Sequence, residues 1–267
     1  ASLWSFNQNP KNSDKAFYQW FCIKEFRQAL SCLLNRERII KQVYRGLGEE
    51  KLDFFPEANA FYNPDIVLRY QFSQEHAAEL LQSVGFAKKS DGVLYDAHGT
   101  AVEFDVSVPS ANTMANDIAQ IIADECRKAG MKVNVRQVDF QKLVEQLTVT
   151  YDWQTLIIGL GSNLFPSQGS NVWPSNGNLH LWYPLQESPA TEWEARIDWL
   201  YNKAKQIPDK AQAKVLWDEY QSILLEQCPV VYLIRARSFF SIRNRWNLDN
   251  FYFDNRSGAK TDYVYLQ

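Results

Sequence analysis

The feature that most constrains the fold is an alternation of strand and helix patterns between residues 102 and 158. Apolar and polar residues alternate over 102–108, as in a strand with one buried face, and a helical three- and four-residue apolar repeat follows over 118–129. A strand pattern at 131–135, a helix capped by Asp139 and an apolar run at 153–158 complete the series. This order predicts an α/β fold, because helices join the parallel strands of one sheet.

The flanking segments extend this organisation. Before it, the sequence predicts a strand at 3–7, an amphipathic helix at 25–43, a helix capped by Ser73 and ended by Gly85, and a hairpin or meander of 93–95 with 102–108. After it, we expect a helix at 191–207, a second helix that follows Pro208 and Asp209 and runs through Tyr220 to Glu226, a strand pair at 230–234 and 239–242, and an irregular aromatic tail. Trp153, Trp199 and Trp217 fall in regular elements and are expected in the core.

Composition excludes several classes of protein. The chain has 267 residues and 46% hydrophobic residues, enough for a large core, and its 28 basic and 31 acidic residues leave no basic cluster for nucleic acid. No apolar run approaches the roughly 18 residues of a membrane span. The first residues do not resemble an export signal, so we expect any such signal to lie upstream or to have been removed.

The four cysteines and three histidines show no metal-binding or catalytic spacing. Without a CxxC pair, the cysteines are interpreted as small core residues, with a disulfide such as Cys22–Cys32 as the alternative. His76 and His98 are interpreted as residues of a solvated helix face and a turn. The chain lacks a complete dinucleotide fingerprint, a P-loop and a GxSxG elbow, so no cofactor, metal or catalytic residue is predicted.

Residues 161–190 form the most unusual segment. Gly, Ser, Asn and Pro fill sixteen of its thirty positions, and its only formal charge is Glu187. Such a long loop is usually functional or disordered, and aromatic residues such as Phe165 and Tyr183 argue against disorder. Trp173 and Trp182 could stack on a neutral, hydrogen-bonding ligand or could equally pack the loop onto the core.

The chain contains a series of short motifs: FRQALS (26–31) with NRERII (35–40), AAELL (77–81) with GF (85–86), the 91–99 hairpin, GMKV (130–133) with VDF (138–140), NVW (171–173), LHLWYP (179–184), TEWEARID (191–198), CPVVY (228–232) and RNR (243–245). In the same order along the chain, they resemble motifs of the bacterial extracellular solute-binding proteins of family 5, the oligopeptide- and dipeptide-binding type that serves ABC importers. The resemblance extends from about residue 3 to residue 246 and corresponds to the C-terminal half of a family member.

The resemblance implies an α/β lobe of the periplasmic binding protein-like class II fold, with a mixed sheet flanked by helices. Residues 1–267 would form the single C-terminal lobe of a two-lobed receptor that closes by hinge motion, with 161–190 lining the ligand and 1–8 and 235–267 near the hinge and the missing first lobe. A lipoprotein signal would lie upstream. The receptor would work in the periplasm or on the outer face of the cytoplasmic membrane, with an ABC permease as partner and without catalysis.

The loop and the resemblance together give a set of candidate ligand-binding residues: Gly161, Ser162, Asn163, Gln168, Asn171, Trp173, His180 and Trp182. In peptide-binding members an Asp that pairs with the peptide α-amine stands where this chain has Asn163, which removes a charge-assisted contact. An oligosaccharide would therefore also suit the site, although family frequency favours oligopeptides. The rival hypotheses are a glycan hydrolase that uses surface carboxylates and a lobe that mainly docks a permease or another partner, with the loop as an apolar contact patch.

Overall fold

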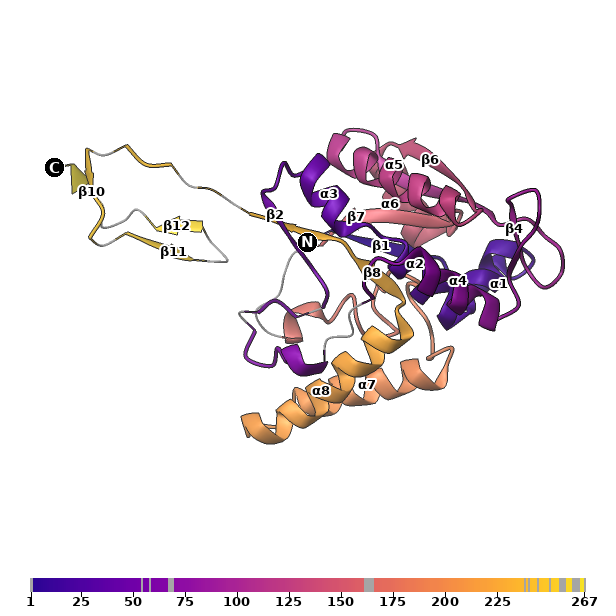
Figure 1. Ribbon diagram of the computed structural model, residues 1–267. Helices are drawn as coiled ribbons and strands as arrows, with labels where there is room; N and C mark the ends of the chain where they lie inside the picture. The colour runs from indigo at the N-terminus through magenta and orange to yellow at the C-terminus, as the bar shows by residue number, and fades with distance from the viewer. Residues whose placement is uncertain are drawn as a thin grey trace. The chain divides into compact units, whose positions relative to one another are not determined.

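A five-stranded mixed sheet with the order β6-β5-β7-β1-β8 organises the computed structural model (Figure 1). Its strands are β1 (Ser2–Phe6), β5 (Glu103–Pro109), β6 (Lys132–Val138), β7 (Thr155–Gly159) and β8 (Val230–Tyr232). Strand β5 is parallel to β6 and β7, whereas β1 is antiparallel to β7 and β8. The predicted α/β fold with a mixed sheet is confirmed.

The structure describes residues 2–53, 55–57, 59–66, 70–160, 166–237, 239, 241–243, 245–249, 251–254, 258–260 and 265–266. They divide into two compact units, Ala1–Ala236 and Arg237–Gln267, and the five-stranded sheet belongs to the first. The second unit contains two antiparallel pairs, β10 (Trp246–Asn247) with β13 (Tyr265–Leu266) and β11 (Tyr252–Asp254) with β12 (Gly258–Lys260).

The α-helices of the first unit are α1 (Ala16–Cys22), α2 (Lys24–Cys32), α3 (Arg36–Gln42), α4 (Gln74–Ser83), α5 (Thr113–Lys128), α6 (Phe140–Glu145), α7 (Glu192–Ala204) and α8 (Lys210–Gln227). Short 3₁₀ turns occur at Pro10–Asn12, Pro64–Ile66 and Pro166–Gly169, and a π-helix at Gln146–Thr150 continues α6. Helices α7 and α8 run side by side (Figure 1). The expected caps are present, since Ser73 accepts a hydrogen bond from the His76 amide and Asp139 accepts from those of Gln141 and Lys142.

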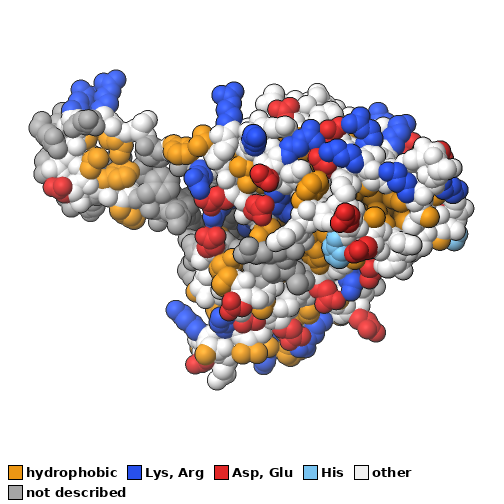
Figure 2. Space-filling model, viewed as in Figure 1, with side chains coloured by type: hydrophobic (Ala, Val, Ile, Leu, Met, Phe, Trp, Pro, Cys, Tyr) orange, Lys and Arg blue, Asp and Glu red, His pale blue; other side chains and the backbone are white. Residues whose placement is uncertain are grey.

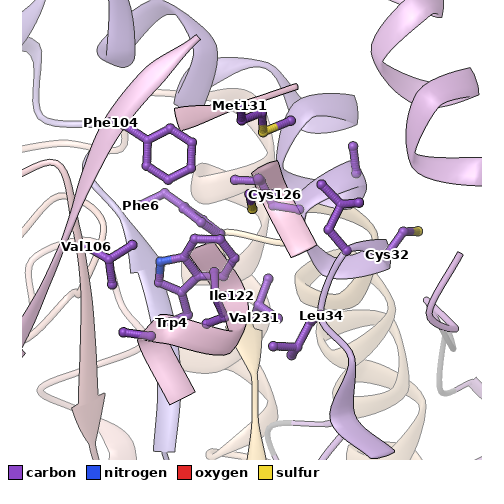
Figure 3. Packing of buried hydrophobic residues seen from close by; sticks show 14 of the residues in the cluster. Trp4, Phe6, Cys32, Leu34, Phe104, Val106, Ile122, Cys126, Met131 and Val231 are labelled. Atoms are coloured by element: carbon purple, nitrogen blue, oxygen red, sulfur yellow. The ribbon is translucent and has the colours of Figure 1, made fainter. Parts of the chain in front are cut away.

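Each face of the sheet is covered by its own hydrophobic core, because successive strand residues point to opposite faces. Trp4 and Phe104 belong to the first core, where strand side chains meet those of α5 (Figure 3). Leu3 and Leu156 belong to the second core, together with Trp173, Trp182, Trp217 and other residues of the loop, α7 and α8. The 171–190 segment is therefore packed onto the second face of the sheet.

The helix predicted at 25–43 is interrupted. Helix α2 ends at Cys32, and the Asn35 side chain accepts a hydrogen bond from the Arg38 amide, so that α3 begins afresh. Asparagine favours such a helix start because its short side chain satisfies a free backbone N–H. Helix α1, just before α2, was not predicted; its seven residues are too few to show a clear period.

The predicted hairpin or meander of 93–95 with 102–108 forms only in part. Strand β4 (Leu94–Tyr95) pairs with β3 (Ala87–Lys88) and meets the following segment only in an isolated bridge between Tyr95 and Ala101. Strand β5 instead enters the central sheet, where its alternate apolar residues reach the first core. Burial of that face outweighs a local hairpin.

The predicted strand pair at 230–234 and 239–242 is also replaced by other partners. Strand β8 pairs with β1, and β9 (Ile234–Ala236) pairs with β2 (Gly48–Glu50). Residues 239, 241 and 242 lie outside the strands, and Phe240 is not among the described residues. The two successive strands β8 and β9 thus extend from the central sheet to the end of the first unit.

Trp199 is the exception among the three tryptophans that were expected in the core. Trp153 and Trp217 are buried as expected, but Trp199 is 49% exposed, because it lies between the core positions Ile197 and Leu200 on the outer side of α7. The guanidinium of Arg196 stacks on it at 4.5 Å from the ring centroid. All four cysteines are free in the structure, and only Cys22 is exposed.

Candidate functional site

The carboxyl ends of β5, β6 and β7 lie at one edge of the sheet. Pro109 pairs with Val138, and Gly159 pairs with Ser2 of β1 at the same level. Leu233, just after β8, donates its backbone N–H to the Ser2 carbonyl at 3.2 Å. Ligands of open α/β sheets bind outside the carboxyl ends of the strands, where the connections leave the sheet. This edge is the candidate site.

The described part of the loop is held by Glu194, a buried residue in the first turn of α7. Its Oε1 accepts hydrogen bonds from Trp182 Nε1 at 2.9 Å and Gln186 Nε2 at 2.8 Å, and its Oε2 accepts from Thr191 Oγ1 at 2.8 Å. Burial raises the pKa of Glu194, but these donors and the imidazole of His180 lower it overall, from 4.5 to about 2. The loop is therefore fixed to α7 by an ionised carboxylate.

His180 lies beside this carboxylate and is fully buried. Its Nδ1 is 3.0 Å from the Val172 carbonyl oxygen, which can only accept, so Nδ1 is the donor. Its Nε2 is 3.6 Å from Glu194 Oε1, within ion-pair distance but longer than a hydrogen bond. The ring centroids of His180 and Trp182 are 3.8 Å apart. His180 thus links two parts of the loop to the buried network.

Gly177 allows the loop to turn back on itself at close range. A Cβ atom at this position would lie 2.5 Å from the Asn171 carbonyl oxygen, which accepts a hydrogen bond from the Leu179 amide. The sequence signal for this contact is only a glycine in a loop rich in small residues.

The structure brings some of the predicted site residues together and leaves others outside its description. Trp173 and Trp182 belong to the second core, and His180 is buried next to Trp182. Asn171 is exposed. Gly161, Ser162 and Asn163 lie outside the described residues, and so does the side chain of Gln168. The contacts of Trp173 and Trp182 support the packing interpretation; ligand stacking on them stays a prediction.

A charged cluster beside the same edge was not predicted. Lys51 lies 5.7 Å from the centroid of the Tyr232 ring, and Arg235 on β9 forms an ion pair with Glu49 and lies 3.6 Å from Glu57. Burial lowers the pKa of Lys51 to about 8. In the sequence Glu49, Lys51 and Glu57 stand in a turn-rich connection without periodicity. About 180 positions separate Lys51 from its neighbours on β8 and β9.

Elsewhere several surface charges form ion pairs. Lys and Arg side chains gather over α5 in Figure 2, and acidic side chains lie among them. Arg38 contacts Asp124 and Glu125 at 2.9 Å each, and Lys128 contacts Glu125 at 2.7 Å. Among the described residues, no helix has the length and apolar character to cross a bilayer, and no His, Cys, Asp and Glu cluster is placed to hold a metal ion.

The fold is that of periplasmic binding proteins. The structure of MelB from Agrobacterium fabrum, a periplasmic binding protein in complex with stachyose, aligns over 88% of this chain and 38% of its own, with a TM-score of 0.78 and 17% identity. The sequence model described as bacterial extracellular solute-binding proteins, family 5 Middle, matches residues 1–180. The chain belongs to this family of solute-binding proteins, as the motifs predicted.

Two relatives are more similar in sequence. A probable ABC transporter-binding protein of Deinococcus radiodurans is 29% identical over 234 residues, which are 83% of this chain and 39% of the relative. The oligopeptide-binding protein AppA of Bacillus subtilis is 27% identical over 217 residues, 79% of this chain and 38% of AppA. The AppA structure in complex with a nonapeptide aligns with a TM-score of 0.74 and 25% identity, over 88% of this chain and 44% of its own. The chain thus spans about two fifths of the length of these relatives.

Proposed function

We propose that this chain is part of the substrate-binding component of an ABC importer, which captures oligopeptides outside the cytoplasmic membrane and delivers them to a permease. The observation that carries the proposal is the similarity to AppA, whose structure contains a nonapeptide. The carboxyl edge of the sheet, where the chain leaves β7 toward the loop, is where such a ligand would lie. Function would then depend on affinity and domain closure and not on catalysis.

We further propose that the first unit is one lobe of a two-lobed receptor and that its hinge lies near Ser2 and Ile234. The Ser2 hydroxyl donates to the Ile234 carbonyl at 3.5 Å, and Leu233 donates its backbone N–H to the Ser2 carbonyl. The two chain segments thus lie side by side at the sheet edge. Hinges are commonly a few residues in loops or at the ends of elements, because such residues can absorb the backbone rotation.

An oligosaccharide is the alternative ligand. Two points favour it. The resemblance to the family implies that Asn163 stands where peptide-binding members have an acidic residue. The structure of MelB, which has a similar fold, is a complex with stachyose. The loop around Asn171 offers amides and hydroxyls for either ligand class.

Isothermal titration calorimetry of the full-length protein against oligopeptides and neutral oligosaccharides tests the proposal. Binding of peptides with negligible binding of sugars is the expected result. Binding of sugars alone would show that the ligand is an oligosaccharide and not a peptide. No binding to either class would overturn the transport function.

A further inference from the structure

One side of α7 carries a regular row of exposed side chains. Glu192, Arg196, Trp199 and Lys203 recur at steps of four, three and four residues, which places them along one face of the helix. All four are exposed, whereas Ile197 on the inner side of α7 belongs to the second core. We call these four residues the outer row of α7. An exposed tryptophan in the middle of such a row calls for a partner, because a large aromatic side chain is costly to leave in water.

Contacts with α8 fix the middle of the outer row. Arg196 Nε and Nη2 donate to Glu219 Oε1 and Oε2 at 2.6 and 2.8 Å, and the same guanidinium lies 4.5 Å from the centroid of the Trp199 ring. Helices α7 and α8 lie side by side and are joined by the short connection 205–209, so they are antiparallel (Figure 1). The register that joins Arg196 to Glu219 therefore brings Val215, which is 67% exposed, close to the level of Trp199. The face has an apolar centre with charged groups around it.

The order of residues in the outer row is self-complementary. The row begins with the acidic Glu192 and ends with the basic Lys203, and Arg196 and Trp199 each lie four residues from one end. If a second α7 is laid antiparallel across the row with Glu192 opposite Lys203, the same register puts Arg196 opposite Trp199. Two ion pairs and two cation–π contacts then form about one two-fold axis.

The charges at the two ends of the row are available for such pairing. No carboxylate of the residues that the structure describes lies within 4 Å of the Lys203 ammonium, and no cationic group among them lies that close to the Glu192 carboxylate. With Arg196 and Glu219, the face carries two groups of each sign. A polyanion or a strongly basic partner would therefore suit it less well than a surface of the same mixed pattern.

We propose that the outer row of α7 is a contact surface for a second copy of this chain, in an antiparallel two-fold arrangement. Glu192 pairs with Lys203 of the second copy, and Arg196 lies against Trp199 of the second copy. An aromatic and arginine centre within a charged rim is the usual composition of a protein interface. This self-association goes beyond the proposed transport function and does not depend on the ligand.

The size of the face sets the expected affinity. Helix α7 has 13 residues and α8 has 18, so they are about 20 and 27 Å long, and together they cover roughly 400 Å² of surface. Stable dimers bury about 800 Å² on each partner. We therefore expect a weak dimer, with a Kd of about 10–100 µM.

Sedimentation velocity of the full-length protein tests the contact over concentrations from about 1 to about 200 µM, because dimerisation follows mass action. Wild type is compared with Trp199→Ser, with Lys203→Glu and with the double variant Glu192→Lys/Lys203→Glu. The control is Phe140→Ser, which removes another exposed aromatic side chain, on α6. All the substituted residues are exposed, so the variants should keep the far-UV spectrum of wild type.

Wild type and Phe140→Ser should dimerise equally, and Trp199→Ser should stay monomeric at the highest concentration. Lys203→Glu brings like charges together twice in each dimer and should raise the Kd at least about tenfold. The double variant reverses both members of each pair and should return to within about threefold of the wild-type Kd. The two charge variants decide the question even if Trp199→Ser does not fold.

Three results would overturn the proposal. Wild type that stays monomeric at the highest concentration would show that the face does not bind a second copy, whatever else contacts it. Dimers that persist in folded Trp199→Ser would place the interface elsewhere on the molecule. Dimers lost in Lys203→Glu and not recovered in the double variant would rule out the antiparallel register. None of these results bears on ligand binding, so the transport function would stand.

Discussion

Trp182 Nε1 donates a hydrogen bond to Glu194 Oε1 at 2.9 Å, in a contact from which solvent is excluded. This bond joins the loop to the first turn of α7. The aromatic loop therefore has a fixed shape that depends on one buried carboxylate.

Glu194→Gln should lower the free energy of unfolding by about 2–4 kcal/mol, because an amide cannot accept from all three donors around this position. Urea unfolding measures the change. Glu192→Gln, an exposed change in the same helical turn, is the control and should cost less than about 0.5 kcal/mol. Equal effects of the two substitutions would show that the network does not hold the loop.

The contribution of Glu194 should also depend on pH. Its pKa is about 2 in the folded chain and 4.5 when unperturbed, so its stabilisation is complete above pH 4.5 and is lost as the pH falls toward 2. The shift corresponds to about 3 kcal/mol. The difference in unfolding free energy between wild type and Glu194→Gln, measured from pH 7 down to pH 3, should shrink below pH 4.5. A constant difference would contradict the assigned ionisation.

Trp182→Phe should lower stability by about 1–2 kcal/mol, because it removes the N–H that Glu194 accepts and leaves a small cavity. Trp199→Phe, on the outer side of α7, should have little effect. If Trp182 acts by packing, its substitution leaves the ligand preference of the full-length protein unchanged in calorimetry. A selective loss of one ligand class would instead show direct stacking.

Lys51→Met should stabilise the chain at pH 7 by about 1–2 kcal/mol, because it removes a poorly solvated charge. The pKa of Lys51 is lower in the folded chain than its ordinary 10.5, so the charge opposes folding below pH 8, and this penalty disappears as the pH rises from 8 to 10.5. Urea unfolding at pH 7 and pH 10 should therefore show a smaller difference at the higher pH. If Lys51→Met instead lowers the stability at pH 7, the charge of Lys51 does not oppose folding.

Gly130→Ala should cost about 2–3 kcal/mol, since Gly130 has φ +94° and a Cβ would lie 2.7 Å from the Gly92 carbonyl oxygen. Gly99→Ala is the matched control, with φ +82° and no atom within 4 Å of the added Cβ, and should cost about 1 kcal/mol. Thermal unfolding of both variants separates the steric clash from the backbone strain. Equal losses would show that the turn at 92–94 moves to accept the methyl group.

Prediction from sequence succeeded where local pattern and burial agree. The apolar run at 153–158 and the capped helices after Ser73 and Asp139 were recognisable because their residues interact within one element. It failed at Asn35, where a capping side chain divides an otherwise continuous helical period. It also failed at β4, because the choice of strand partner depends on which face the rest of the chain buries.

The sequence by itself determined the α/β organisation, the family and the existence of an unusual aromatic loop, because these depend on periodicity and on motifs along the chain. Only the tertiary structure decided that Trp182 is enclosed beside Glu194 and that Lys51 lies over Tyr232 at the sheet edge. Side-chain burial and ionisation are set by neighbours distant in the chain: Lys51 and Tyr232 meet because β2 and β9 pair. That pairing has no counterpart in any local pattern of residues.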